Sequence, residues 1–230
     1  MNGILKKVLT YLVLPVIIIA LFYLIYQSVM EPVKFNKQKD FREQVAIQRL
    51  KDIRDLEVAF KSVNNHFTAS ADSLVDFYNN GKMKIVMQVG SQDDSAAVAN
   101  TEKVRKANKK ITSQELFNLY KEGQNLVFSI STEIPVKDTM FRSRTDFVID
   151  SLKTIPFSGG EPIQMDATVK KVSGVDVPLF EARMPYKILL QGLDNQLRIN
   201  LDCEKKDQNR FPGLQVGSVT APNNNAGNWE

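Results

Sequence analysis

Few residues in this sequence are of types that carry chemistry. His66 is the only histidine and Cys203 the only cysteine, which excludes a two-histidine zinc site and an intramolecular disulfide. His66 follows a predicted helix, and no Gly-x-Ser-x-Gly segment supplies a nucleophile that it could activate. We therefore interpret His66 as a loop residue and not as a catalytic base.

Motifs for nucleotides and metals are also missing. The sequence contains no Gly-x-x-x-x-Gly-Lys-Ser/Thr, no Gly-x-Gly-x-x-Gly and no Asp-x-Asp/Asn-x-Asp/Asn-Gly loop. Nothing in the sequence sets the separation of its acidic residues, so we interpret Asp93, Asp94, Asp138, Asp146 and Asp150 as solvated loop positions. We expect no enzyme activity, no catalytic or metal-binding residues and no cofactor.

The residues best suited to a function are apolar and recur at helical spacing. Residues 37–64 contain neither Gly nor Pro, and their apolar positions repeat every three or four residues, as in an amphipathic helix. This interaction stripe consists of Leu50, Ile53, Leu56, Phe60 and Val63. The charged opposite face is expected to hold Glu43, Arg49, Lys51, Asp52, Arg54, Asp55 and Glu57.

The interaction stripe could be buried in two ways. It either packs on the sheet of its own domain or pairs with a second copy of the chain. The heptad repeat fails after about two heptads, whereas a coiled coil needs at least three or four, so packing within the domain is favoured. Trp229, the only tryptophan, completes the candidate interaction surface, either by docking the C-terminal segment or by contacting a partner.

An apolar segment precedes and positions these residues. Residues 8–30 contain no charged side chain, and about twenty apolar residues in a helix span the hydrocarbon core of a bilayer. The run is longer than that of a signal peptide and no small-x-small cleavage site follows, which favours an uncleaved signal-anchor. Membrane lipid is therefore the expected partner of residues 8–30. The helix is expected to be interrupted at Glu31–Pro32, because the residue before proline is pushed out of the α region.

The domain organisation follows from this segment. Residues 1–7 form a short cytoplasmic leader, and residues 31–210 form one domain on the periplasmic side of the inner membrane. Residues 37–80 are predicted to be helical, and residues 125–203 are predicted to be mainly strands. A Gly- and Asn-rich tail, residues 211–230, completes the chain. The fold class is α+β: an N-terminal transmembrane helix, an amphipathic helix, then a mainly antiparallel β-sheet domain.

Local patterns add detail to this outline. Residues 90–110 are polar and Ala-rich with weak periodicity, which predicts a loop, whereas residues 111–124 begin with a helix-capping pattern. Alternating apolar residues over 197–203 predict a strand in which Cys203 is buried.

The layout resembles that of type IV pilins and pseudopilins. The passage RLKDIRDLEVAFKSVNNHFTASADSLVDFY is similar to the point where their long helix ends before an aromatic-rich segment, and the likeness covers residues 1–90. The sequence departs from that family at the processing site, where Gly3-Ile4 is the only candidate and Val8 stands in place of the family's Glu. The chain is also similar to uncharacterised membrane-anchored proteins of Gram-negative bacteria, a resemblance that implies no activity.

Charge and organisation leave two main functions. The net charge of +4 is spread along the chain, which argues against a nucleic-acid partner. The basic run 103–110 is interpreted as solvated, with contact to anionic headgroups as the alternative. The leading hypothesis is an exported assembly or interaction domain whose partner is a second copy or another envelope protein. The alternative is an exported module that binds peptide, glycan or lipid in a pocket within residues 125–210.

Overall fold

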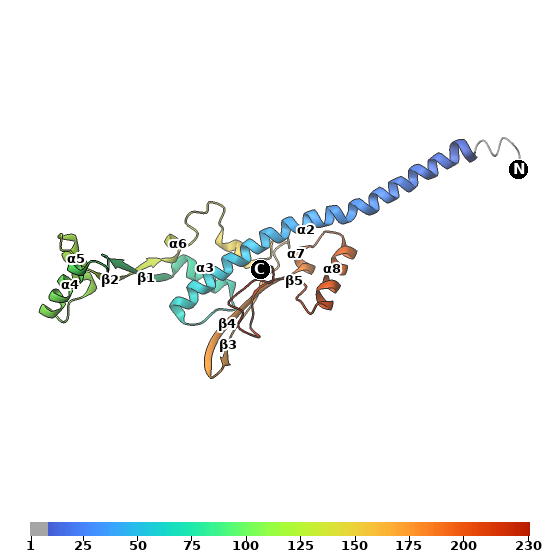
Figure 1. Ribbon diagram of the computed structural model, residues 1–230. Helices are drawn as coiled ribbons and strands as arrows, with labels where there is room; N and C mark the ends of the chain where they lie inside the picture. The colour runs from blue at the N-terminus through green and yellow to red at the C-terminus, as the bar shows by residue number, and fades with distance from the viewer. Residues whose placement is uncertain (1–8) are drawn as a thin grey trace. The chain divides into compact units, whose positions relative to one another are not determined.

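The computed structural model describes residues 9–230 and has an α+β fold. A long N-terminal helix, shorter helices and two antiparallel sheets make up this fold (Figure 1), which confirms the predicted fold class. The leader, residues 1–7, and Val8, the first residue of the predicted anchor, lie outside the described residues. The chain divides into two units: the first consists of the residues up to Arg54 together with Asp150–Glu230, and the second of Asp55–Ile149.

One continuous helix forms the N-terminal part of the structure. A π-helical turn, η1 (Leu9–Val13), leads into the 51-residue helix α2 (Leu14–Asn64). The predicted interruption at Glu31–Pro32 is wrong, because α2 continues through Pro32. Proline leaves the carbonyl of Ser28 without its helical donor, but Ser28 is exposed, so water can satisfy that carbonyl. Among the described residues, this is the one helix long and apolar enough to cross a membrane.

The first unit is built around a three-stranded antiparallel sheet in the order β3-β4-β5 (Gln164–Val172, Val175–Pro185 and Gly213–Gly217). Ser173 and Gly174, both with positive φ, join β3 to β4 in the tight turn whose twist suits a hairpin. The central strand β4 supplies the core, since Phe180, Ala182 and Met184 are completely buried.

The predicted tail belongs to this sheet. β5 lies within residues 211–230, and Val216 forms a further bridge with Gly227. The last residue, Glu230, accepts a 2.7 Å hydrogen bond from Arg54 of α2. The tail prediction is therefore corrected: these residues form an edge strand of the domain and a docked C-terminal segment.

Helices replace several predicted strands between residues 125 and 203. The short helices η2 (Ile149–Lys153) and α7 (Tyr186–Leu189) and the longer α8 (Asn195–Asp207) occupy this range. The strand predicted over 197–203 is wrong, and Cys203 is exposed on α8. Helix is favoured there because Asp194 caps the first turn, accepting from the backbone N–H of Leu197 at 2.8 Å, and because Arg198 pairs with Asp202 one turn along.

The second unit contains the end of α2, helix α3 (Ala71–Asn80) and a long two-stranded ribbon. β1 (Lys82–Val89) pairs antiparallel with β2 (Phe128–Pro135), and the short helix α6 (Val136–Thr139) follows. Ser70 caps α3 through the backbone N–H of Ser73.

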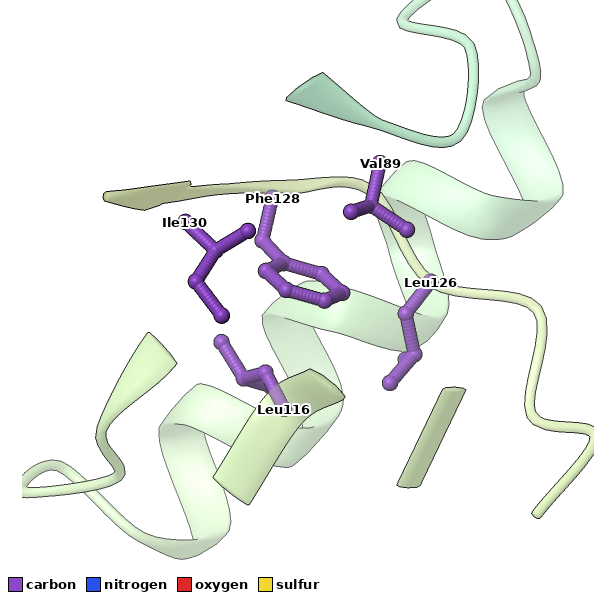
Figure 2. Close-up of a cluster of buried hydrophobic side chains, with 5 residues drawn as sticks. All are labelled: Val89, Leu116, Leu126, Phe128 and Ile130. Carbon is purple, nitrogen blue, oxygen red and sulfur yellow. The ribbon is translucent and has the colours of Figure 1, made fainter. Parts of the chain in front are cut away.

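Two helices close the ribbon at one end. They are α4 (Ser95–Ala107) and α5 (Ser113–Lys121), and α5 packs on β2. Figure 2 shows the cluster that forms the core there: Val89, Leu116, Leu126, Phe128 and Ile130. The loop predicted over 90–110 is wrong, because α4 begins where the Asp94 side chain accepts from two backbone N–H groups.

Candidate functional site

The first candidate site is the apolar part of α2. Every residue from Leu14 to Val29 is exposed, and Ile17 and Ile19, which lie on nearly opposite faces, are 52% and 69% exposed. Consecutive helical residues are rotated by about 100°, so the segment is apolar on all sides. The twenty residues from Tyr11 to Met30 extend about 30 Å, which is the thickness of a bilayer's hydrocarbon core. This segment is compatible with a single-pass membrane anchor.

After the apolar segment, Arg42 connects α2 to α7 within the first unit. Its guanidinium donates to the carbonyl oxygens of Leu189 at 3.0 Å and Gln191 at 2.8 Å, and it lies 5.0 Å from the ring centre of Phe157. A cation here satisfies the carbonyls at the end of α7. Arg42 is therefore a structural residue of the first unit.

The structure divides the predicted interaction stripe. Leu50, Ile53 and Leu56 are completely buried within the chain. Packing within the chain therefore uses these three residues, and they do not form an exposed surface in this structure. Phe60 is half-buried, and Val63 is 42% exposed, so only the end of the stripe reaches the surface.

Phe60 lies in an aromatic group at the end of α2. Its ring packs edge-on against Phe77 at 5.3 Å and His66 at 5.6 Å. The Nδ1 atom of His66 lies 2.8 Å from the carbonyl oxygen of Asn64, and no acidic side chain among the described residues is hydrogen-bonded to the imidazole. His66 thus sits in a loop with an aromatic and a backbone neighbour.

An open groove of about 570 Å³ lies beside this aromatic group, within the second unit. Phe60 and Phe77 form its apolar wall, and Asp72 and Asp76 of α3 line its polar side. Asp76 accepts a 2.7 Å hydrogen bond from the side chain of Asn80. The groove lies outside residues 125–210, where the alternative hypothesis predicted a pocket.

Two carboxyl groups of the predicted charged face are buried. Asp52 is 3% exposed and Glu57 is 0% exposed, so their assignment to that face is wrong. Helical spacing could have indicated this, because Glu57 lies four residues after Ile53 and Asp52 four residues before Leu56, both on the apolar side. The predicted position on the charged face is confirmed for Asp55, which is exposed.

Burial changes the ionisation of Glu57. Oε2 accepts a hydrogen bond from the backbone N–H of Thr68 at 3.1 Å, while Oε1 has no hydrogen-bond partner. Loss of solvent raises the pKa of Glu57 to about 8, against the smaller opposing effect of the Thr68 N–H. The side chain is therefore mostly protonated at neutral pH.

Trp229 belongs to the C-terminal segment of the first unit. Its indole lies on Gly227, where a Cβ atom would come within 2.4 Å of the ring. The neighbouring Asn228 donates from its backbone to Gln215 and from its side chain to Gly213, both at 2.9 Å. These two bonds attach the C-terminal segment to β5, and the assignment of Trp229 to an interaction surface stays a prediction.

A second cavity, of about 200 Å³, lies in the first unit beside residues 39–47 of α2, and we call it the α2–α8 cavity. Its walls come from α2, α7, α8 and the C-terminal segment, so it includes part of the range predicted for a pocket but is not confined to it. Tyr186, on its wall, is hydrogen-bonded to Glu43, and burial followed by this bond and the carboxylate charge raises the pKa of Tyr186 far above its usual value. The phenol therefore stays protonated and donates to Glu43.

Comparison of the chain with protein-family models, curated proteins and solved structures finds no match. The resemblance of residues 1–90 to type IV pilins and pseudopilins therefore stays a prediction. Within residues 9–230, no group of three or more His, Cys, Asp or Glu side chains gathers to hold a metal ion.

Proposed function

We propose that the chain is a single-pass, membrane-anchored envelope protein whose exported part serves assembly or interaction and has no catalytic role. The observation that supports the proposal most strongly is the exposure of apolar side chains on all sides of α2 from Leu14 to Val29. Ten exposed Leu, Ile, Val and Phe side chains lie in this stretch. Their transfer out of water is worth on the order of 20 kcal/mol in total. A hydrocarbon environment would supply that stabilisation.

The side of the membrane is inferred from the sequence. Lys6 and Lys7 precede the apolar segment, as basic residues precede the core of an export signal. Lys34 and Lys37 follow it and are exposed, but a long domain crosses the membrane largely regardless of such charges. We therefore place the bulk of the chain on the periplasmic side of the inner membrane.

The side of the membrane can be tested with the natural sequence. Cys203 is the only cysteine and is exposed on α8. In spheroplasts of a Gram-negative host, a membrane-impermeant maleimide should label Cys203 without lysis, while a cytoplasmic marker protein stays unlabelled. Labelling of Cys203 only after lysis would reverse the proposed topology.

Assembly through the exposed end of the stripe can be tested by disulfide cross-linking in native membranes. In a Cys203→Ser background, Val63→Cys should yield a covalent homodimer under mild oxidation. Asp55→Cys is the matched control, because Asp55 is exposed on the same helix but does not belong to the stripe. Monomer alone from both variants would contradict self-assembly through this surface, and equal dimer from both would indicate collision without a specific contact.

A further inference from the structure

The α2–α8 cavity contains two cations that are not neutralised by the protein. Lys205 and Arg210 line it, and neither forms an ion pair with any residue of the described chain. The other charged groups on the wall are engaged: Lys39 lies 3.9 Å from Glu43 and 3.3 Å from Asp40. Glu43 accepts from the phenol on α7 and is paired with Lys39, so the wall carries three cationic side chains against one carboxylate.

The end of α8 brings these two cations together. Asn209 has φ +55°, and the backbone N–H of Arg210 donates to the carbonyl of Lys205 at 2.9 Å. The N–H of Asn209 donates to the carbonyl of Lys206 at 2.9 Å. This pair of bonds is the Schellman ending of a helix, and it folds Arg210 back beside the last turn. The helix ending therefore places both side chains at the same cavity.

Apolar side chains make up much of the rest of the cavity wall. Ile47 of α2, Leu201 of α8, Leu214 of β5 and the indole of Trp229 line it. A volume of about 200 Å³ corresponds to roughly six or seven water molecules at about 30 Å³ each. The space suits a small ligand with one strongly anionic group and a compact organic body.

We propose that the α2–α8 cavity binds a phosphate ester. The planar guanidinium of Arg210 matches two phosphate oxygens, and the ammonium of Lys205 supplies a further charge-assisted hydrogen bond. Two unneutralised cations balance the charge of a phosphate monoester, whereas a carboxylate would balance one of them. The apolar wall accommodates the organic part of the ester.

A phosphate monoester is available both as a lipid headgroup, in phosphatidic acid, and as a soluble compound. Lys39 on the cavity wall lies nine residues after Met30, the last residue of the predicted anchor. That spacing is about 14 Å along a helix, so the cavity lies near the headgroup region if α2 spans a membrane. The binding chemistry itself does not depend on the anchor.

The single tryptophan provides the assay, because Trp229 lines the cavity. The full chain in non-ionic detergent micelles is titrated with glycerol 3-phosphate, with short-chain phosphatidic acid and with acetate, and Trp229 emission is recorded. Calorimetry on the same samples gives the affinity if the emission does not change. Saturable binding of at least one phosphate compound and no saturable binding of acetate is the expected result.

Charge-neutral variants separate the site from general attraction. Lys205→Gln and Arg210→Gln should each weaken binding about tenfold or more, as expected for loss of one charge-assisted hydrogen bond worth about 1.5–3 kcal/mol. Lys206→Gln removes the same charge from the next residue, which is exposed and does not line the cavity, and should change the affinity less than twofold. Arg210→Lys, which keeps the charge but loses the planar fork, should fall between them.

The ligands also identify the source of the phosphate. Tighter binding of phosphatidic acid than of glycerol 3-phosphate assigns the cavity to a lipid headgroup, and the reverse order assigns it to a soluble ester. The proposal is overturned if neither phosphate compound binds saturably, if acetate binds as tightly, or if Lys206→Gln weakens binding as much as Lys205→Gln. A failure to detect this binding would not contradict membrane anchoring by α2, because anchoring is tested separately by carbonate extraction and by labelling of Cys203.

Discussion

Replacing Glu57 with glutamine should change how the stability of the chain depends on pH. Glu57 is completely buried and accepts one hydrogen bond from the backbone N–H of Thr68. Glutamine has nearly the same shape, and its amide oxygen can accept that bond, but it does not ionise. The substitution therefore removes the titration while keeping the packing.

The sign and size of the effect follow from the two pKa values. The ordinary pKa of a glutamate side chain, 4.5, applies when the chain is unfolded, and burial raises the pKa of Glu57 to about 8 in the folded chain. Between these values the folded state keeps a proton that the unfolded state has released, so the stability contributed by this group falls as the pH rises. At about 1.4 kcal/mol per pH unit, the loss between pH 5 and pH 8 is about 4 kcal/mol.

Urea unfolding of the full chain in detergent micelles measures this effect. The free energies of unfolding of wild type and Glu57→Gln are compared at pH 5 and pH 8, so that the titration of all other groups cancels in the difference. The variant should be close to wild type at pH 5 and several kcal/mol more stable at pH 8. Asp55→Asn, at an exposed position on the same helix, should show no such change. An equal difference between wild type and Glu57→Gln at both pH values would refute the reasoning.

Three further substitutions test the helix and the cores. Ile18→Asp with Phe22→Asp should add about 6 kcal/mol to the free energy of insertion on the scale measured for the translocon, where the ten large apolar side chains of the segment favour insertion by only about 5 kcal/mol, less than their full transfer out of water. The chain should then leave the membrane in carbonate, whereas the double alanine variant should stay in it. Leu50→Ala should lower the free energy of unfolding by about 2–5 kcal/mol, measured by calorimetry or urea, because Leu50 is fully buried. Val63→Ala, at a 42% exposed position, should lower it by less than about 0.5 kcal/mol. Equal losses would show that the two ends of the stripe are in similar environments. Phe128→Ala should destabilise the cluster of Figure 2 by about 3–5 kcal/mol. The rate of backbone amide hydrogen exchange should then rise within residues 82–135. A rise spread evenly over the chain would show that this cluster is not a separate cooperative region.

The elements that sequence predicts well are those specified by a few adjacent residues. Ser70 caps α3, and Thr112 and Glu115 form the reciprocal cap of α5. Ser173 and Gly174 adopt the two positive φ values that a tight hairpin turn needs. In each case the physical cause lies within four residues of chain, so it can be recognised without knowing what packs on the element.

The elements that sequence predicts poorly depend on more distant partners. Leu197, Ile199 and Leu201 alternate with polar residues as in a strand. However, α8 has no buried residue, so packing on a core does not decide between strand and helix. The N-cap at Asp194 and the ion pair of Arg198 with Asp202 favour the helix. The candidate cavity was missed for the same reason, since the positions of its cations depend on where α8 ends.

The buried carboxyl groups were missed because residue type outweighed spacing. Glu57 was assigned to the charged face by its chemistry, although its position four residues after Ile53 places it on the apolar side of α2. Helix α4 was missed because its buried face lacks large apolar residues. That face consists of Ala97 and Thr101, which are too small or too polar to form a recognisable apolar stripe in the sequence.

Anchoring of the finished chain by its apolar helix is tested most directly by alkaline carbonate extraction of membranes from cells that make the wild-type protein, with the mass of the extracted chain determined intact. The expected result is a chain that stays in the membrane pellet and whose mass includes residues 9–30. A chain recovered in the carbonate supernatant, or one whose mass shows that it begins beyond Met30, would contradict membrane anchoring by α2.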